Sequence, residues 1–248
     1  MTRLHRPQTK RGAILAIGGA VVVLGSVGLA LVYFVLFPTS APAPFALTTT
    51  GRAATTTAGS SSAVAGAAIA GTWTIATGSE AGYRVREKLE FLPAQSDAVG
   101  RTSAITGSMT LTGSNSALQV TAASFKADLS KLKSDRSMRD ERIRTIGLQS
   151  DTYPTATFKL TTPISLPADA QGISAASVSA TGVLTIHGTS KTVTIPLELR
   201  VTGSALEAVG SLTFPWGEFG MTAPSVGGFV NVTNKATMEF DLHLRRAS

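Results

Sequence analysis

The chain has 248 residues, no cysteine and a formal net charge of +7 at pH 7. The absence of cysteine excludes disulfides, thiolate metal sites and cysteine nucleophiles. Five of the 22 basic residues precede residue 71, where no acidic residue occurs, so 17 basic and 15 acidic residues follow. With nearly equal numbers of basic and acidic residues, the part of the chain after residue 70 lacks the excess positive charge that binds a polyanion. We therefore expect no nucleic-acid partner.

The N-terminal region predicts a membrane anchor. Residues 1–12 form a polar, basic tail, and residues 13–37 contain no charged residue. A helix of that length spans roughly 37 Å, enough to cross a hydrocarbon core of about 30 Å. The basic flank places the tail in the cytoplasm and the later residues outside it. We therefore expect a single-pass cell-membrane protein with an extracytoplasmic C-terminal domain.

Two alternatives compete with this uncleaved signal anchor. A cleaved signal peptide would have a shorter apolar region, and its cleavage triplet Ala41-Pro42-Ala43 is followed unfavourably by Pro44. The other alternative is a buried core helix, but an uncharged run that is apolar on every side favours a membrane span in a chain of this size. Residues 38–70 are rich in Pro, Ser, Thr and Ala, and we expect a flexible linker whose ends average roughly 30 Å apart.

Residues 71–248 form the predicted folded domain, in which apolar residues recur at every second position. Strict alternation over five or more residues indicates half-buried strands. Turn signals separate the alternating stripes, and no strand–helix–strand alternation occurs, so the pattern predicts an antiparallel sandwich or barrel. The stripes cover residues 83–91, 105–111, 118–122, 178–186, 193–201, 206–214 and 236–244.

One segment between the strands, residues 134–158, lacks this alternation. Its charged residues between Asp135 and Arg144 predict a short helix, with Ser137 as N-cap in capping-box spacing with Asp140. Gly147 is the predicted stop signal. A helix this short needs tertiary support. Three apolar side chains are expected to pack it on the strands: Met138, Ile143 and Ile146.

The charged residues of this segment allow two interpretations. In one, arginines such as Arg139 form a polar rim that holds an anionic head group, such as a pyrophosphate. In the alternative, which the spacing favours, Arg139 pairs with Asp135 four residues earlier. Glu87 shares the apolar face of its predicted strand, and it needs a partner if it is buried.

No catalytic constellation stands out. The histidines, His5, His187 and His243, lack metal-ligand spacing and do not lie near clustered carboxylates. There is no serine-hydrolase elbow and no phosphate-binding loop. We therefore expect no enzyme activity, no metal and no cofactor.

Alternation does not distinguish a barrel filled by side chains from one that holds a small ligand. By counting alone, a plain core is favoured. Three sequence elements nevertheless resemble the YceI-like family, lipocalin-like proteins that bind polyisoprenoids. The resemblance spans about residues 71–246, and its elements are Met138-Arg139-Asp140 with Ile143 and Tyr153-Pro154, the hairpin at 182–191, and Phe219-Gly220-Met221.

The resemblance implies an extended eight-stranded antiparallel lipocalin-like barrel with a short helical insertion and a long apolar cavity, here preceded by one transmembrane helix. It also implies a long-chain amphiphile as ligand, either a polyisoprenoid or an isoprenoid quinone, bound for carriage, storage or sequestration. The alternative is a ligand-free structural or protein-interaction barrel of the cell envelope. The expected apolar lining is Phe91, Phe125, Phe158, Trp216 and Met221, and the expected polar rim is Arg139, Asp140 and Tyr153.

Overall fold

The computed structural model describes residues 41–48, 69–89, 95–114, 117–167, 175–226 and 230–247. The predicted tail and anchor, residues 1–37, and the predicted lining residue Phe91 lie outside these ranges. Within the ranges, no helix has both the length and the apolar character needed to cross a membrane. The compact unit that contains the described strands begins at Pro42.

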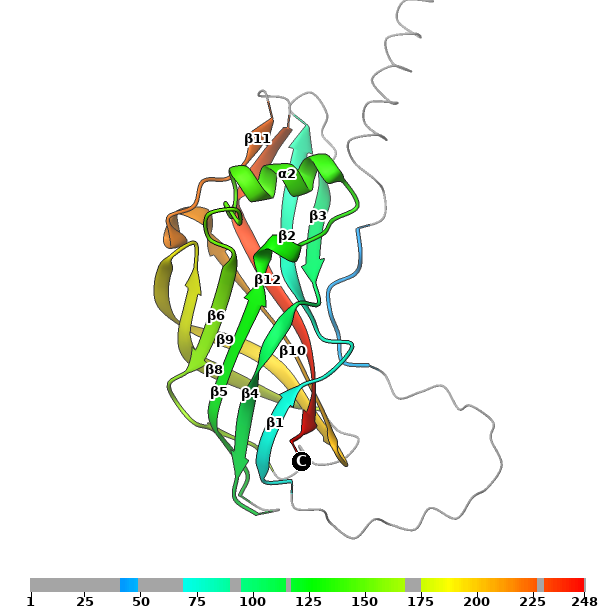
Figure 1. Ribbon diagram of the computed structural model, residues 1–248, viewed down its shortest axis with the longest axis vertical. Helices are drawn as coiled ribbons and strands as arrows, with labels where there is room; N and C mark the ends of the chain where they lie inside the picture. Colours follow the sequence, from blue (N-terminus) through cyan, green and yellow to red (C-terminus); the bar gives the residue numbers. More distant parts are fainter. Residues whose placement is uncertain are drawn as a thin grey trace, which may run out of the picture. The chain divides into compact units, whose positions relative to one another are not determined.

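The described residues fold into one large antiparallel sheet, interrupted by a short helical segment (Figure 1). The strands are β1 (Gly71–Ile75), β2 (Glu80–Leu89), β3 (Gln95–Thr102), β4 (Ile105–Thr112), β5 (Gln119–Asp128), β6 (Thr155–Leu160), β7 (Ile164–Ser165), β8 (Ala176–Ile186), β9 (Thr189–Thr202), β10 (Ala205–Pro215), β11 (Ser225–Val226) and β12 (Val230–Arg246). The helices are η1 (Leu129–Lys131), α2 (Ser137–Thr145) and η3 (Trp216–Phe219).

Eight strands close into a barrel. Their order is β1-β4-β5-β6-β8-β9-β10-β12, and β12 pairs back to β1 from Trp73↔Arg246 to Ile75↔Leu244. Closure leaves these eight strands without a free edge. The predicted eight-stranded antiparallel barrel with a helical insertion is therefore confirmed.

The long strand β12 organises the sheet. It has 17 residues, and on one side it pairs with the whole of β10. On its other side it pairs first with β2 and then with β1. Strand β3 pairs with β2, so the β2–β3 hairpin extends the wall at one end of the barrel.

The predicted alternation places one face of each strand inside the barrel. Residues at positions 195, 199 and 201 of β9, and 242 and 244 of β12, are buried accordingly. The stripe predicted over residues 118–122 is an exception, because the pairing of β4 with β5 shifts register between Thr110 and Leu111. This bulge exposes Ala122 and turns Ala123 and Phe125 towards the interior.

The helical insertion joins β5 to β6 and lies across the end of the barrel at β2 and β3 (Figure 1). The predicted N-cap is wrong: Ser137 is the first helical residue, and the capping position is held by Arg136, which makes no capping bond. Asp140 instead accepts hydrogen bonds from the Ser134 backbone N–H and hydroxyl, at 2.8 and 2.7 Å. Asp140 thus binds the loop that precedes the helix, and the expected capping box with Ser137 does not form.

The end of α2 follows the prediction more closely. The Gly147 N–H donates to the Arg142 carbonyl at 3.1 Å, just after the last helical residue. Ile143 is buried and Ile146 is half-buried, as expected for side chains that hold the helix on the strands. Met138 is 62% exposed, so its predicted packing is wrong. Met138 lies in the first turn of α2, on the side away from the barrel.

Candidate functional site: two apolar cavities and a polar end

The barrel interior contains a cavity of about 130 Å³. Phe125 of β5, Phe158 of β6 and Phe240 of β12 line it. These rings, like Leu197 and Met238, occupy the inward face of their strands but are half-buried rather than buried. We attribute the exposed ring surface to the cavity itself. At this level the barrel is lined by side chains and is not filled by them.

Glycines on the neighbouring strands make room for two of these rings. A Cβ at Gly182 would lie 2.6 Å from Phe158 Cζ, and a Cβ at Gly210 would lie 2.6 Å from Phe240 Cζ. Each ring therefore lies in close contact with a strand position that carries no side chain. The predicted apolar stripes contain both glycines, so their role here is close approach and not flexibility.

A second cavity of about 80 Å³ continues the interior towards the helical insertion. Trp216 and Met221 line it, together with Tyr83 and Leu148. The Trp216 indole N–H donates to the Thr233 carbonyl at 3.0 Å, which leaves the ring itself as apolar wall. The two cavities are neighbours because four lining residues belong to both: Ala81, Ala127, Ala156 and Met238.

The size of the cavities limits what they hold without rearrangement. An engineered cavity of about 150 Å³ in another protein binds benzene and stays free of water. The larger cavity, at about 130 Å³, therefore suits one ring or one branched five-carbon unit. A longer chain would have to displace the side chains between the two cavities, of which Met238 is a flexible example.

Next to the second cavity lies a buried ion pair. Arg139 of α2 donates from Nη2 and Nε to the Glu87 carboxylate of β2, at 2.9 and 3.1 Å. Both side chains are about nine-tenths buried, and Arg139 also pairs with Asp135. Burial alone lowers the pKa of Arg139, but the bonds and charges of the two carboxylates outweigh burial and raise it. The guanidinium is charged, but its charge is already neutralised.

The Tyr83 hydroxyl lies in this polar region without a hydrogen-bond partner in the described part of the chain. Its ring covers Gly100 of β3, where a Cβ would come within 2.4 Å of Tyr83 Cε1. Burial raises the pKa of Tyr83, and the nearby Asp140 and Glu87 carboxylates add to the increase against the opposing charge of Arg139. The phenol therefore keeps its proton and remains a hydrogen-bond donor.

The three predicted rim residues do not surround a common point. Asp140 is bonded to Ser134. Tyr153 packs on His187, with 4.2 Å between the ring centroids, beside the β8–β9 turn. Arg139 and Asp140 both lie near Tyr83, but Arg139 is already paired with the Glu87 and Asp135 carboxylates. Its pairing with Asp135 is the alternative that the sequence favoured.

Of the predicted lining residues, Phe125 and Phe158 border the first cavity, and Trp216 and Met221 border the second. Their contact with a ligand stays a prediction. Sequence reasoning missed Tyr83 and Phe240. Both belong to recognised apolar stripes, so alternation placed them inside the barrel, but nothing in the pattern showed which inward positions border empty space.

One group of possible metal ligands occurs in the described ranges, with donor atoms of Glu207, Asp241 and His243 within 4.8 Å of one another. The Glu207 carboxylate is already bonded to Arg200 at 2.6 Å and to Thr48 at 2.8 Å. A metal ion there would compete with the guanidinium for the same oxygens and would be repelled by its charge. We assign no metal to this group.

Comparison with known proteins gives one family and several related folds. Residues 73–244 match the family model of the YceI-like domain. A search of curated protein sequences found no match.

The described fold is similar to solved structures of low sequence identity. A polyisoprenoid-binding domain from Saccharophagus degradans, implicated in plant cell wall breakdown, matches with TM-score 0.52 and 15% identity, over 72% of this chain and 99% of that one. A mutant Campylobacter jejuni YceI protein with a monobromobimane guest matches with TM-score 0.51 and 14% identity, over 65% and 91%. Burkholderia cenocepacia BcnA matches with TM-score 0.47 and 21% identity, over 66% and 95%. At such identities the first two structures show the shared fold alone.

Proposed function

The chain belongs to the YceI-like domain family, and from this premise we propose that it binds a long-chain isoprenoid lipid inside its barrel. One observation carries the proposal: the barrel contains adjoining cavities with apolar walls, and inward-facing rings such as Phe158 keep accessible surface there. A packed structural barrel has no need of such a surface. The Saccharophagus degradans domain of similar fold is described as polyisoprenoid-binding, which supports the same ligand class.

Burial of the chain supplies the affinity in this proposal. Each buried methylene contributes about 0.8 kcal/mol, so one five-carbon unit contributes up to about 4 kcal/mol before the entropy cost of ordering it. Such a ligand needs little polar chemistry. Carriage, storage or sequestration therefore fits the site better than catalysis, and we propose a binding protein and not an enzyme.

The polar end of the cavities favours a neutral head group. Of the residues that line either cavity, Lys126 alone is charged, and its side chain is exposed. Arg139 is neutralised by Glu87 and Asp135, so a pyrophosphate would gain no free cation there. The Tyr83 hydroxyl offers a donor that has no partner among the described residues. An isoprenoid quinone, whose carbonyl oxygen accepts one hydrogen bond, matches this arrangement best.

We also propose that the barrel works at a membrane. The support is the uncharged run at residues 13–37 behind a basic tail, with the length and flanking charge of a single-pass anchor. In this arrangement the barrel lies outside the cytoplasm, where it takes a lipid from its own bilayer. Flotation of the full chain with vesicles, compared with a chain lacking residues 13–37, tests the anchor separately from the ligand.

The lipid proposal is tested by native mass spectrometry of the full chain after gentle detergent extraction. The same preparation is then incubated with a short-chain isoprenoid quinone, a polyprenyl pyrophosphate and an unrelated fatty acid. We expect a stoichiometric quinone complex, and weaker complexes with the other two. A chain that carries no lipid and takes up no isoprenoid compound would favour the structural or protein-interaction alternative.

A further inference from the structure

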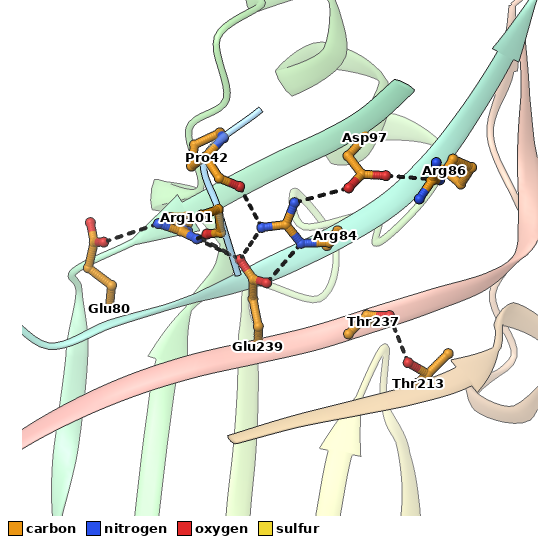
Figure 2. Close-up of polar contacts among 10 residues, drawn as sticks. Pro42, Glu80, Arg84, Arg86, Asp97, Arg101, Thr213, Thr237 and Glu239 are labelled. Carbon is orange, nitrogen blue, oxygen red and sulfur yellow. Dashed lines mark hydrogen bonds and ion pairs between the residues drawn. The ribbon is translucent and has the colours of Figure 1, made fainter. Parts of the chain in front are cut away.

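Residues 42–48, with no helix or strand of their own, lie against the outer wall of the barrel, and we call them the strap. Arg84 of β2 donates from Nη2 to the Pro42 carbonyl at 2.7 Å. Arg101 of β3 donates from Nη2 to the Ala43 carbonyl, also at 2.7 Å. Figure 2 shows both guanidinium groups at the start of the strap. The wall thus binds the strap through its backbone.

The other end of the strap is held by a second cluster. The Thr48 backbone N–H and hydroxyl both donate to Glu207 Oε1 of β10, each at 2.8 Å. Arg200 of β9 donates to the Thr48 carbonyl at 2.6 Å and to Glu207 Oε2 at 2.6 Å. The strap is therefore fixed at both ends, by strands that lie on opposite sides of β12.

The wall beneath the strap is built to be covered. Residues 206–209 of β10 are buried without interruption, whereas alternation would leave every second one exposed. Glu239 of β12 faces outward but is only 2% exposed. Arg84 Nε and Arg101 Nη2 donate to its carboxylate at 3.1 and 2.9 Å (Figure 2). A buried carboxylate on an outer face needs charged partners and a cover that excludes water. In the described residues, Arg84 and Arg101 are the charged partners of Glu239, and the strap bound to both arginines is the cover.

The composition of the strap lowers the cost of docking. Pro42 and Pro44 restrict the backbone before it docks, so less conformational entropy is lost. They also lack N–H groups that would otherwise need partners. The Phe45 ring lies under the Arg101 guanidinium, with 3.7 Å between Cζ and the ring centroid. Such a cation–π contact is attractive, so it adds to the hydrogen bonds that hold the strap.

Docking changes the length of the tether between the barrel and the proposed anchor. From residue 37 to residue 42 the chain reaches at most about 18 Å. If the whole stretch from 38 to 70 were free, the reach would be on the order of 110 Å. We propose that the strap shortens the tether to residues 38–41, so that the barrel meets its lipid at the surface of its own bilayer. This inference rests on the proposed anchor at 13–37.

Two matched insertions in the full chain, reconstituted in vesicles, test the inference. One variant receives twenty Gly/Ser residues between Ser40 and Ala41, and the other receives the same insert between Ala58 and Gly59. Because the chain has no cysteine, Lys191→Cys gives a unique dye position for energy transfer to labelled lipid. The insert adds roughly 25 Å of average reach.

We expect the first insertion to lower energy transfer markedly and the second to leave it unchanged. When residues 42–48 are replaced by a Gly/Ser segment of equal length, the second insertion should lower transfer as well. Equal effects of the two insertions in the wild-type background would overturn the inference, and so would the absence of any effect.

A measurement without membranes separates this inference from the anchor proposal. Hydrogen exchange of the Thr48 amide in the detergent-solubilised full chain should be slow, and the Gly/Ser replacement should make residue 48 exchange fast. Fast exchange in the wild type shows that the strap is not docked, whatever the vesicles show. Slow exchange in a chain that fails to float with vesicles refutes the anchor and the shortened tether, and leaves docking intact.

Discussion

Arg139 of α2 and Glu87 of β2 form a two-bond ion pair across 52 residues of sequence, with 2.9 Å between Nη2 and Oε2. The pair attaches the helical insertion to the wall that it covers. Glu87 sits on the inward face of β2 beside Val85 and Tyr83, where an unpaired carboxylate would be costly. The arginine of the family-like Arg139-Asp140 element thus has a structural partner in this chain.

Removal of one member of this pair should destabilise the barrel strongly. Arg139→Met leaves Glu87 buried without its counter-ion, and we expect a loss of about 3–5 kcal/mol in the free energy of unfolding. The double variant Glu87→Leu/Arg139→Met should recover most of that loss, because it buries no unpaired charge. Urea unfolding followed by circular dichroism measures both.

Arg144→Met is the matched control, since Arg144 is 44% exposed and pairs with the exposed Glu141. An exposed pair contributes about 0–1 kcal/mol, so this variant should be nearly neutral. Single-variant losses that simply add in the Glu87/Arg139 double variant would contradict the coupling between the two residues.

Phe158→Trp should reduce ligand uptake more than stability. Phe158 borders the first cavity and packs against both buried clusters of the barrel, so a larger ring has empty space to enter. We expect at least a tenfold weaker affinity for an isoprenoid quinone, about 1.4 kcal/mol, with a smaller change in unfolding free energy.

The fully buried Phe219, which borders neither cavity, gives the control. Phe219→Trp should mainly destabilise the fold through overpacking, and equal losses of uptake and stability at Phe158 would indicate a plain core position.

Tyr83→Phe should have opposite effects on the empty and the loaded protein. The substitution removes a buried hydroxyl that has no partner in the described residues, so the ligand-free barrel should be as stable or more stable by about 1 kcal/mol. Affinity for a quinone should fall roughly tenfold through loss of one hydrogen bond, while affinity for an isoprenoid hydrocarbon should not change. Calorimetric titration with both ligands makes the comparison. An equal loss for both ligands would rule out a hydrogen bond from Tyr83 to the head group.

The Thr48 end of the strap should be released by acid. Burial raises the pKa of Glu207, but the bonds from Thr48 and Arg200 outweigh burial and hold it below the ordinary value of 4.5. With a lowered folded-state pKa, the stabilisation is complete above pH 4.5 and is lost as the pH falls through the lower folded value. We expect slow Thr48 exchange at pH 5.5 and fast exchange well below pH 4, after correction for the intrinsic rate.

A neighbouring carboxyl, that of Asp241, also takes up a proton in acid. Burial, the charge of Glu207 and that of Glu80 raise the pKa of Asp241, against the opposing effect of His243. Protonation of Asp241 therefore begins above its ordinary value of 3.8. Glu207→Gln should abolish the acid release, since its amide oxygen still accepts from Thr48 without titrating, and Asp241→Asn should preserve it. Acid release that persists in the Glu207 variant would assign the transition to another group.

The strands were predictable because burial on one face leaves a period of two in the sequence. The closure of β12 on β1 was expected from the family resemblance alone, since alternation shows which face is buried and not which edges meet. The register of strand pairing is not visible in the sequence either. Opposite the step from Thr110 to Leu111, a bulge in β5 exchanges the outward and inward positions of that strand. Neither β4 nor β5 carries a glycine or proline at this point that would have indicated the bulge. Phe125, which turns inward as a result, is a predicted lining residue that lies outside the stripe predicted over residues 118–122.

The polar features show a second limit. Sequence spacing proposed Asp135 as a partner for Arg139, because helical neighbours four residues apart are readable along the chain. Glu87 was recognised as a buried acid in need of a partner, yet its partner lies in a segment that only the fold brings near. The docking of Pro42 and Ala43 left no pattern at all, because the atoms that bind are backbone carbonyls, which every residue possesses.

The length of β12 also has a consequence for how the chain folds as it is made. Strand β1 pairs with β4 on one edge, and strand β2 pairs with β3. The other edge of each strand finds its partner only in residues 230–246. These long-range pairings close a loop of more than 140 residues and are therefore slow to form. One edge of β1 and one edge of the β2–β3 hairpin therefore stay open until the last strand has been synthesised. During synthesis an open strand edge of this kind is prone to pair with other chains.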